Sequence, residues 1–231
     1  MVGLQSMLNH IIMNTTMMRL KGELMATDLK KGNQPTIFSI LAAALLLCAG
    51  FQYGFDKLPE LKEMALAGTA SALFSAVLIM LTNILPANIK HKLVFTRLVD
   101  EMPAGRCHRL CARDSRIDID IAKERWPRTF SPLITKAERN GLWYREIYKP
   151  VKDSNEVMQS HRSFLLYRDL CSGLIIISIS AVCWKLWGDP KLLGALNNEV
   201  FIILSLFTVT SLIAARNSGN RLVTNAVAKA I

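Results

Sequence analysis

The sequence predicts an all-α integral membrane protein with four transmembrane helices, arranged as two hairpins that flank a small helical cytosolic domain. Three observations support this fold class. Hydrophobic residues make up 51% of the chain and its mean hydropathy is positive, four long stretches carry no charged residue, and the Lys and Arg residues gather on one side of those stretches. A chain with this composition is solvated in part by lipid.

Four stretches are free of Asp, Glu, Lys and Arg and approach the roughly 20 helical residues that cross a bilayer. They are residues 36–55, 65–86, 170–184 and 200–215. The last two are short, but Lys185 can extend its ammonium group past Trp184 to the membrane surface. The alternative is that one or more of these stretches are buried helices of a soluble protein.

The distribution of Lys and Arg predicts the side of the membrane on which each loop lies, because cytoplasmic segments beside spans are enriched in these residues. The tails and the middle region carry thirteen of them near the spans: Arg19, Lys21, Lys30, Lys31, Lys90, Lys92, Arg97, Lys152, Arg162, Arg168, Arg216, Arg221 and Lys229. The two short hairpin loops carry four: Lys57, Lys62, Lys185 and Lys191. Both termini and the middle region are therefore predicted to be cytoplasmic.

The spans divide the chain into five predicted parts. They are an amphipathic cytosolic segment (1–35), a first hairpin (36–86), a basic helical cytosolic domain (87–169), a second hairpin (170–215) and a cytosolic C-terminal tail (216–231). Small and hydroxylated side chains within the spans suit close helix packing, either inside one chain or in a homo-oligomer.

The first half of the middle region contains two helix signals. Apolar residues recur at helical spacing over residues 89–102, which predicts a helix that continues until Pro103 interrupts it. Asp118 is a typical N-cap residue and predicts a short helix through Trp126.

The second half contains two further start signals. Thr135 and Glu138 have the spacing of a capping box. Asp153 and Glu156 predict another cap, which opens a helix that runs unbroken through Arg168 into the third span. The domain is therefore expected to be helical and tethered to the membrane at both ends.

The closest grouping of metal-ligand residue types is Cys107-His108-x-x-Cys111. Structural zinc and iron–sulfur sites usually combine two ligand pairs of similar spacing, and no second pair of this kind follows. We therefore expect two free thiols and an ordinary histidine, and predict no metal and no cofactor.

Asp114, Asp118 and Asp120 form an acidic cluster that in principle suits a divalent metal and phosphoryl chemistry. No glycine-rich phosphate loop accompanies it. We favour the interpretation that these acids pair with the neighbouring cations Arg113, Arg116, Lys123 and Arg125.

The middle domain is basic, with seventeen Lys and Arg against eleven Asp and Glu over residues 87–169. Attraction to anionic lipids and ordinary solvation account for this excess. The aromatic residues between the charges leave a nucleic-acid or nucleotide surface as an alternative.

Four spaced motifs lie in the middle region and at the start of the third span: LVFTRL (93–98), RID (116–118), WYR (143–145) and HRSFLLYRD (161–169). In these motifs the chain resembles an uncharacterised family of bacterial inner-membrane proteins with four helices. The resemblance implies a bacterial inner-membrane location and the two-hairpin layout, and it brings no assigned activity.

The leading functional hypothesis is a non-enzymatic membrane effector or sensor. Its cytosolic domain would receive a signal or a partner protein, and its hairpins would oligomerise and permeabilise the inner membrane in a bacterial stress or anti-phage response. Two alternatives stay open. One is an accessory subunit of a larger membrane complex, and the other is a membrane-bound enzyme that uses the region of Asp114, Asp118, His108 and His161.

Residues at the boundary between the cytosolic domain and the third span are expected to couple the two. The candidates for this signal coupling are Trp143, Tyr144, His161, Arg162, Arg168 and Asp169. A salt bridge from Arg162 or Arg168 to a neighbouring acid is the structural alternative.

Overall fold

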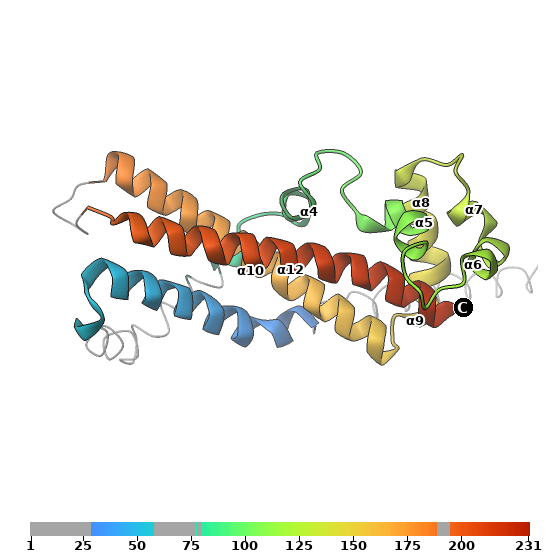
Figure 1. Cartoon of the computed structure of the whole chain (residues 1–231), viewed down its shortest axis with the longest axis horizontal. Coiled ribbons are helices and arrows are strands. Elements are labelled where there is room, and N and C mark those ends of the chain that lie inside the picture. The colour runs from blue at the N-terminus through green and yellow to red at the C-terminus, as the bar shows by residue number, and fades with distance from the viewer. Residues whose placement is uncertain (1–28, 58–76, 78–79, 189–194) are drawn as a thin grey trace, which may run out of the picture.

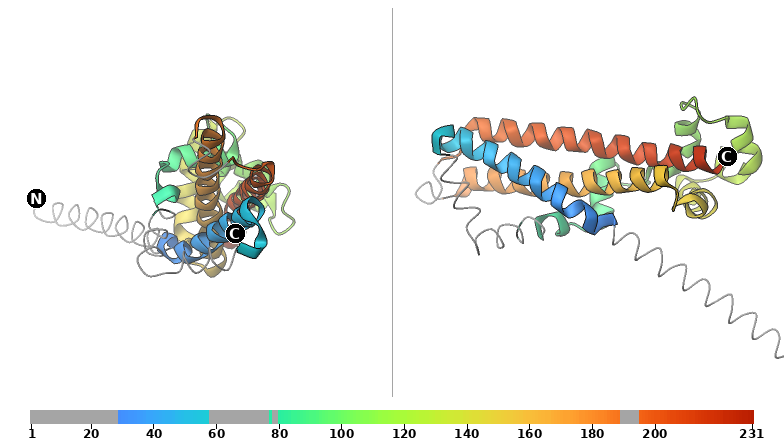
Figure 2. Two further views of the ribbon diagram at one scale, coloured as in Figure 1. Left: turned by 90° about the vertical axis from the view of Figure 1, so that its left-hand side faces the viewer. Right: turned by 90° about the horizontal axis from the view of Figure 1, so that it is seen from below.

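Three long helices lie side by side in an elongated molecule, and most of the shorter helices gather at one end of it (Figures 1 and 2). The computed structural model describes residues 29–57, 77, 80–188 and 195–231. The long helices are Leu29–Tyr53, called here the first helix, α10 (Asn155–Trp187) and α12 (Asn198–Ala230). All regular structure in the described ranges is helical, which confirms the predicted all-α class.

Each of the three long helices is long and apolar enough to cross a membrane. They contain the predicted first, third and fourth spans. The predicted amphipathic segment, most of the predicted second span and the loop of the second hairpin lie outside the described residues. Three candidate spans are therefore found, and the fourth stays a prediction.

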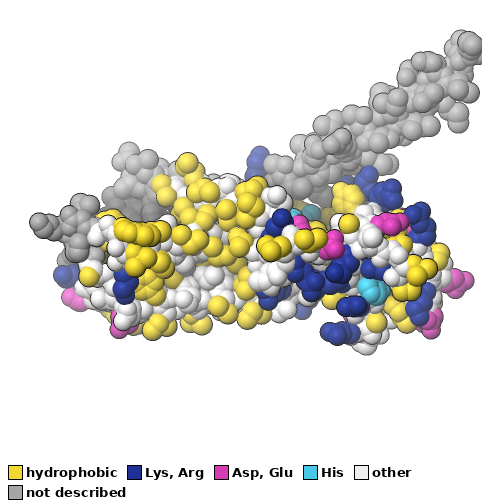
Figure 3. Space-filling model, turned by 90° about the horizontal axis from the view of Figure 1, so that it is seen from above, with side chains coloured by type: hydrophobic (Ala, Val, Ile, Leu, Met, Phe, Trp, Pro, Cys, Tyr) yellow, Lys and Arg dark blue, Asp and Glu magenta, His cyan; other side chains and the backbone are white. Residues whose placement is uncertain are grey.

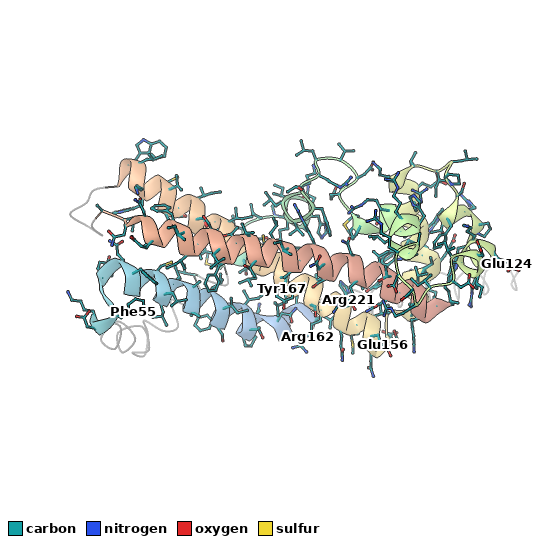
Figure 4. All side chains as sticks on the ribbon, in the orientation of Figure 1. Phe55, Glu124, Glu156, Arg162, Tyr167 and Arg221 are labelled. Carbon is teal, nitrogen blue, oxygen red and sulfur yellow. The ribbon has the colours of Figure 1, made fainter. Side chains whose placement is uncertain are left out.

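The shorter elements form a globular end together with residues 216–230 of α12 (Figure 1). They are η2 (Pro103–Arg106), α5 (Cys107–Cys111), α6 (Ile119–Arg125), α7 (Pro127–Phe130), α8 (Lys136–Leu142), the π-helical turn η3 (Trp143–Tyr148) and α9 (Lys149–Val151). The helix α4 (Ala87–Phe95) lies nearer the middle of the molecule and adds Val94 and Phe95 to the same core. At the opposite end, the short 3-10 turn η1 (Phe55–Lys57) follows the first helix. Phe55 and Glu124 mark these two ends in Figure 4.

In the half of the molecule that is remote from the globular end, large apolar side chains on the three long helices are exposed on the outer surface. This hydrophobic belt contains Leu46, Leu47, Phe51, Ile179, Val182, Leu186, Ile202, Leu206, Val209 and Ile213, all of them exposed. Figure 3 shows hydrophobic side chains spread over this half of the molecule and Lys and Arg gathered over the other half. An apolar surface on adjacent helices, bounded by charges, is the pattern that a bilayer stabilises.

Inside the belt the first helix packs on both other long helices. Leu41 and Leu174 are completely buried where it meets α10. Cys48 packs against Val200 and Leu204 of α12. At its far end, the Gln52 side chain donates a hydrogen bond to the Ala195 carbonyl at 2.9 Å, which ties the end of the first helix to the segment before α12.

Two of the predicted helix starts are confirmed. The Asp118 carboxylate accepts hydrogen bonds from the backbone N–H groups of Asp120 and Ile121, and the Thr135 hydroxyl accepts from that of Glu138. The predicted start of α10 is wrong by one residue, because the N-cap of this helix is Ser154 and not Asp153. The predicted continuity of this helix through Arg168 into the charge-free residues 170–184 is confirmed.

The predicted helix over residues 89–102 is too long. It ends at Phe95, because Thr96 adopts a left-handed conformation with φ of 47°. The Thr96 N–H then bonds back to the Leu93 carbonyl and the Arg97 N–H to the Lys92 carbonyl. Arg216 of α12 fixes this end by donating to the Val94 carbonyl at 2.6 Å. The apolar periodicity had placed Leu98 on the buried face of a longer helix, but its side chain is 81% exposed.

The predicted C-terminal tail, residues 216–231, is almost entirely helical, and its cytosolic position stays a prediction. These residues continue α12 without a break, and Leu222, Val223, Ala226 and Val227 are buried in the core of the globular end. The hydrophobic effect therefore holds this segment against the helices of the middle domain. The globular end is built from two parts of the chain rather than one.

Two glycines give a matched test of this packing. A Cβ on Gly105 would lie 2.8 Å from the backbone carbonyl oxygen of Lys136, whereas a Cβ on Gly141 meets nothing within 4 Å. We expect Gly105→Ala to lower the free energy of unfolding by about 1–3 kcal/mol through overpacking. Gly141→Ala should raise it by about 0.4–1 kcal/mol, because alanine reduces the entropy of the unfolded chain. Urea unfolding of both variants checks this, and equal effects would contradict it.

Candidate functional site

Four charged or titratable side chains meet where the hydrophobic belt joins the globular end. This junction cluster consists of Lys90 and His91 of α4 with Arg168 and Asp169 of α10. Lys90 Nζ lies 2.9 Å from Asp169 Oδ1, and the two side chains are only 3% and 2% exposed. Lys90 Nζ also donates to the Thr82 carbonyl at 2.5 Å. The cluster therefore ties α4 to α10 at the edge of the belt.

Arg168 completes the cluster through the same carboxylate oxygen. Its Nε donates to Asp169 Oδ1 at 3.0 Å, and its Nη1 lies 3.2 Å from His91 Nε2. A guanidinium group has no acceptor, so His91 Nε2 accepts and the imidazole proton resides on Nδ1. The His91 ring also stacks on Phe164 at a centroid distance of 5.9 Å.

Burial governs the protonation of the α4 side chains. It lowers the pKa of His91 to about 4, with the charge of Arg168 acting in the same direction. Burial also lowers the pKa of Lys90, although the Asp169 carboxylate opposes this shift. A buried ion pair often adds little net stability, because desolvation offsets its attraction, but breaking it leaves an uncompensated charge. The pair thus favours one arrangement of α4 on α10.

His91 makes the stability of the protein depend on pH. Its ordinary pKa of 6.5 falls to about 4 on folding, so the unfolded chain binds the proton more readily. The contribution of His91 to the free energy of unfolding is therefore fully present above pH 6.5 and is lost as the pH falls from 6.5 to 4. Below pH 4 this group causes no further loss. The expected loss is about 2–3 kcal/mol. Unfolding of the protein and of His91→Gln across this range measures it, and parallel pH profiles would contradict the prediction.

Three of the predicted coupling residues form an aromatic group on α10 and η3. Tyr148 stacks on Trp143 and Tyr144, with ring centroids 5.4 and 5.5 Å apart. Its hydroxyl oxygen lies 2.9 Å from His161 Nδ1 on α10. Burial raises the pKa of Tyr148 to about 12, so the hydroxyl stays protonated and joins the globular end to α10.

Arg162 joins α10 to the first helix. Its Nε donates to Asn33 Oδ1 at 3.0 Å, and the Asn33 amide donates to the Arg162 carbonyl at 2.8 Å. Figure 4 places Arg162 where α10 passes the start of the first helix. The predicted salt bridge therefore exists for Arg168, while Arg162 binds a neutral partner.

The six predicted coupling residues thus lie in three separate contact groups along the first half of α10. The prediction missed Lys90 and His91, which complete the junction cluster. A usable signal existed: Lys90 follows Pro86 at the end of one charge-free stretch and Asp169 immediately precedes another. Opposite charges at the same end of two predicted spans are candidates for pairing.

The chain matches no protein-family model, no curated protein and no solved structure. The resemblance to bacterial inner-membrane proteins therefore stays a prediction, and function has to be argued from the geometry alone.

The acidic cluster is occupied by local interactions. Arg116 pairs with Asp114 at 2.7 Å and Lys123 pairs with Asp120 at 2.9 Å, as favoured from the sequence. Asp118 serves as the cap of α6. In the described part of the chain, no group of three or more His, Cys, Asp and Glu residues is placed to hold a metal ion.

Cys107 and Cys111 are completely buried in the core of the globular end. Burial raises the pKa of each thiol to about 12. A thiol rather than a thiolate is present at neutral pH, and the thiol is a poor nucleophile and a poor metal ligand. These residues contribute packing to the core of the globular end.

Proposed function

We propose that this protein is a membrane-embedded effector or sensor of the bacterial inner membrane, with the globular end in the cytoplasm. The hydrophobic belt supports insertion, since it lies on all three long helices and is bounded by charges. The excess of Lys and Arg at the other end supports a cytoplasmic position for the globular end and both termini.

One observation carries the proposal: α10 and α12 are continuous from the globular end into the belt. Each has 33 residues, which corresponds to a rod of about 50 Å. Their polar halves help to build the globular core and their apolar halves form the belt. A shift of either helix at the globular end therefore moves its membrane half as well.

The junction cluster holds the resting arrangement. Lys90 and Asp169 form a buried ion pair at the level where the belt ends, and Arg168 and His91 surround it. A signal or partner that displaces α4 would separate buried charges and favour another packing of the helices. Rearranged hairpins then oligomerise and permeabilise the membrane in a stress or anti-phage response.

The test compares membrane potential and dye entry in bacteria that express the full chain or Lys90→Met/Asp169→Asn at equal amounts in the membrane fraction. This double substitution removes the ion pair but retains the aliphatic stem of residue 90 and an acceptor for Arg168. We expect the unaltered chain to depolarise part of the population and the double variant to depolarise more. Asp120→Asn, which removes an exposed carboxylate, should resemble the unaltered chain.

Unchanged potential with all three proteins at good expression would overturn the effector proposal. Stable co-purification with another membrane protein would then support an accessory subunit. An activity that is lost on single substitution of His108 or Asp118 without loss of folding would support the enzyme alternative.

A further inference from the structure

A basic cavity of about 480 Å³ opens beside the end of α4. This volume lies within the range of roughly 300–1,000 Å³ that is typical of small-ligand pockets. The cavity is lined by Phe95, Thr96, Arg97, Arg106, Arg216 and Asn220. Its three arginines come from the segment after α4, from η2 and from α12, so the tertiary structure brings them together.

The positive charge in this cavity has no counter-charge in the described structure. No acidic residue lines it, and none of the ion pairs in the described ranges involves Arg97, Arg106 or Arg216. Among the described residues, Arg216 donates to two neutral acceptors, the Val94 carbonyl and the Thr96 hydroxyl. Burial lowers the pKa of Arg106, and the charges of Arg97 and Arg109 act in the same direction. An anion would relieve this repulsion.

Two buried polar atoms at the cavity also lack a hydrogen-bond partner among the described residues. They are Arg106 Nε and Asn220 Oδ1. Unpaired buried polar atoms are uncommon in folded proteins and call for an explanation. A ligand with several oxygen atoms would accept from Arg106, and rotation of the Asn220 amide would present its NH₂ group to the same ligand.

The cavity lies at the level where the hydrophobic belt ends. Arg216 directly follows the charge-free residues 200–215 of α12, and Asn220 lies about one helical turn further along. Figure 3 shows Lys and Arg side chains gathered at this boundary. In the proposed topology this is the depth of the phosphate groups in the cytoplasmic leaflet.

We propose that Arg97, Arg106, Arg216 and Asn220 form a binding site for a phosphate-bearing anion. Guanidinium groups bind phosphate oxygens through charge-assisted and often bidentate hydrogen bonds. The headgroup of an anionic lipid and a soluble phosphate share this chemistry. The bound anion joins the end of α4 to α12, the same two elements that Arg216 already connects. The site follows from the cavity itself and goes beyond the proposed effector function.

The test measures the thermal unfolding midpoint of the full chain in a neutral detergent at constant ionic strength. The probes are short-chain phosphatidylglycerol, short-chain phosphatidylcholine and inorganic phosphate. An anion that binds the folded state and not the unfolded chain stabilises it by RT ln(1 + [L]/Kd), so the midpoint rises with the anion concentration. The variants are Arg97→Gln and Arg106→Gln, with Arg113→Gln as the control because this exposed arginine lies outside the cavity and removes the same charge.

We expect phosphatidylglycerol or inorganic phosphate, but not phosphatidylcholine, to stabilise the protein and Arg113→Gln alike. The apparent affinity should fall at least about tenfold in Arg97→Gln and Arg106→Gln. Stabilisation by phosphatidylglycerol alone identifies the lipid headgroup as the source, and equal stabilisation by inorganic phosphate identifies a soluble ligand.

No stabilisation by either anion, or equal affinity in all three variants, would overturn the proposal. If Arg106→Gln fails to fold, Arg97→Gln decides the test. The Arg97 side chain makes no hydrogen bond to another described residue, so its replacement should leave the fold intact. The assay does not depend on membrane permeability, so its failure is distinct from failure of the proposed function.

Discussion

Arg139→Met is expected to lower the free energy of unfolding of the globular end by about 3–5 kcal/mol. Arg139 is 3% exposed, and its guanidinium donates to the carbonyls of Gly105, Thr129 and Ser131 at 3.1, 3.0 and 2.6 Å. Methionine fills much of the same volume but donates nothing. The three carbonyls then lose a donor in or near the core, where water replaces it poorly.

Arg128→Met is the matched control. Arg128 also lies in the globular end, but its side chain is 70% exposed and it pairs with Glu138 at the surface. Its loss should cost less than about 1 kcal/mol. Urea unfolding of the full chain in neutral detergent measures both, with Trp184 and Trp187 replaced by phenylalanine so that Trp126 and Trp143 report from the globular end. Equal effects of the two substitutions would contradict the assigned role of Arg139.

Asp169→Asn is expected to lower the free energy of unfolding by about 3–5 kcal/mol. The change is nearly isosteric, but it leaves the buried cation Lys90 without its anion, 2.9 Å away, and removes the negative partner of Arg168. The low dielectric near the junction makes an unpaired charge costly. Urea unfolding of the full chain with Trp184 and Trp187 retained measures the loss, because a tryptophan then reports from each side of the junction.

The double variant Lys90→Met/Asp169→Asn should recover much of this loss. It removes the buried cation together with the anion, and residue 169 still accepts a hydrogen bond from Arg168. Asp120→Asn provides the control, because the Asp120 side chain is 85% exposed and its pair with Lys123 is solvated. Lys90→Met alone completes the cycle. If the loss in the double variant equals the sum of the two single losses, the two charges are not coupled and the junction cluster does not act as a unit.

The short helix α4 links the junction cluster to the basic cavity. Lys90 ties it to α10, and Arg216 of α12 holds its C-terminal end beside the basic cavity. Displacement of α4 would therefore affect the ion pair and the cavity together. A ligand in the cavity would favour the arrangement in which the pair is closed, which links the proposed anion site to the proposed resting state.

Hydrophobic length and local start signals were readable from the sequence alone. Charge-free stretches indicated the apolar parts of the first helix, α10 and α12, because lipid-facing helices require this composition whatever their neighbours are. Asp118 and Thr135 marked helix starts correctly, since a cap acts on backbone groups only two or three residues away. The continuity of α10 from the globular end into the third predicted span also followed from an uninterrupted helical pattern.

Long-range pairing was decided only by the tertiary structure. The end of α4 at Phe95 depends on Arg216, a residue more than a hundred positions away, and the junction cluster depends on Lys90 meeting Asp169 across the fold. The same holds for residues 216–231, for which the sequence predicted a cytosolic position but not the burial of Val223 and Val227 against the middle domain. A sequence pattern records the local preference of each segment, whereas the partner of a buried charge is set by which helices pack together.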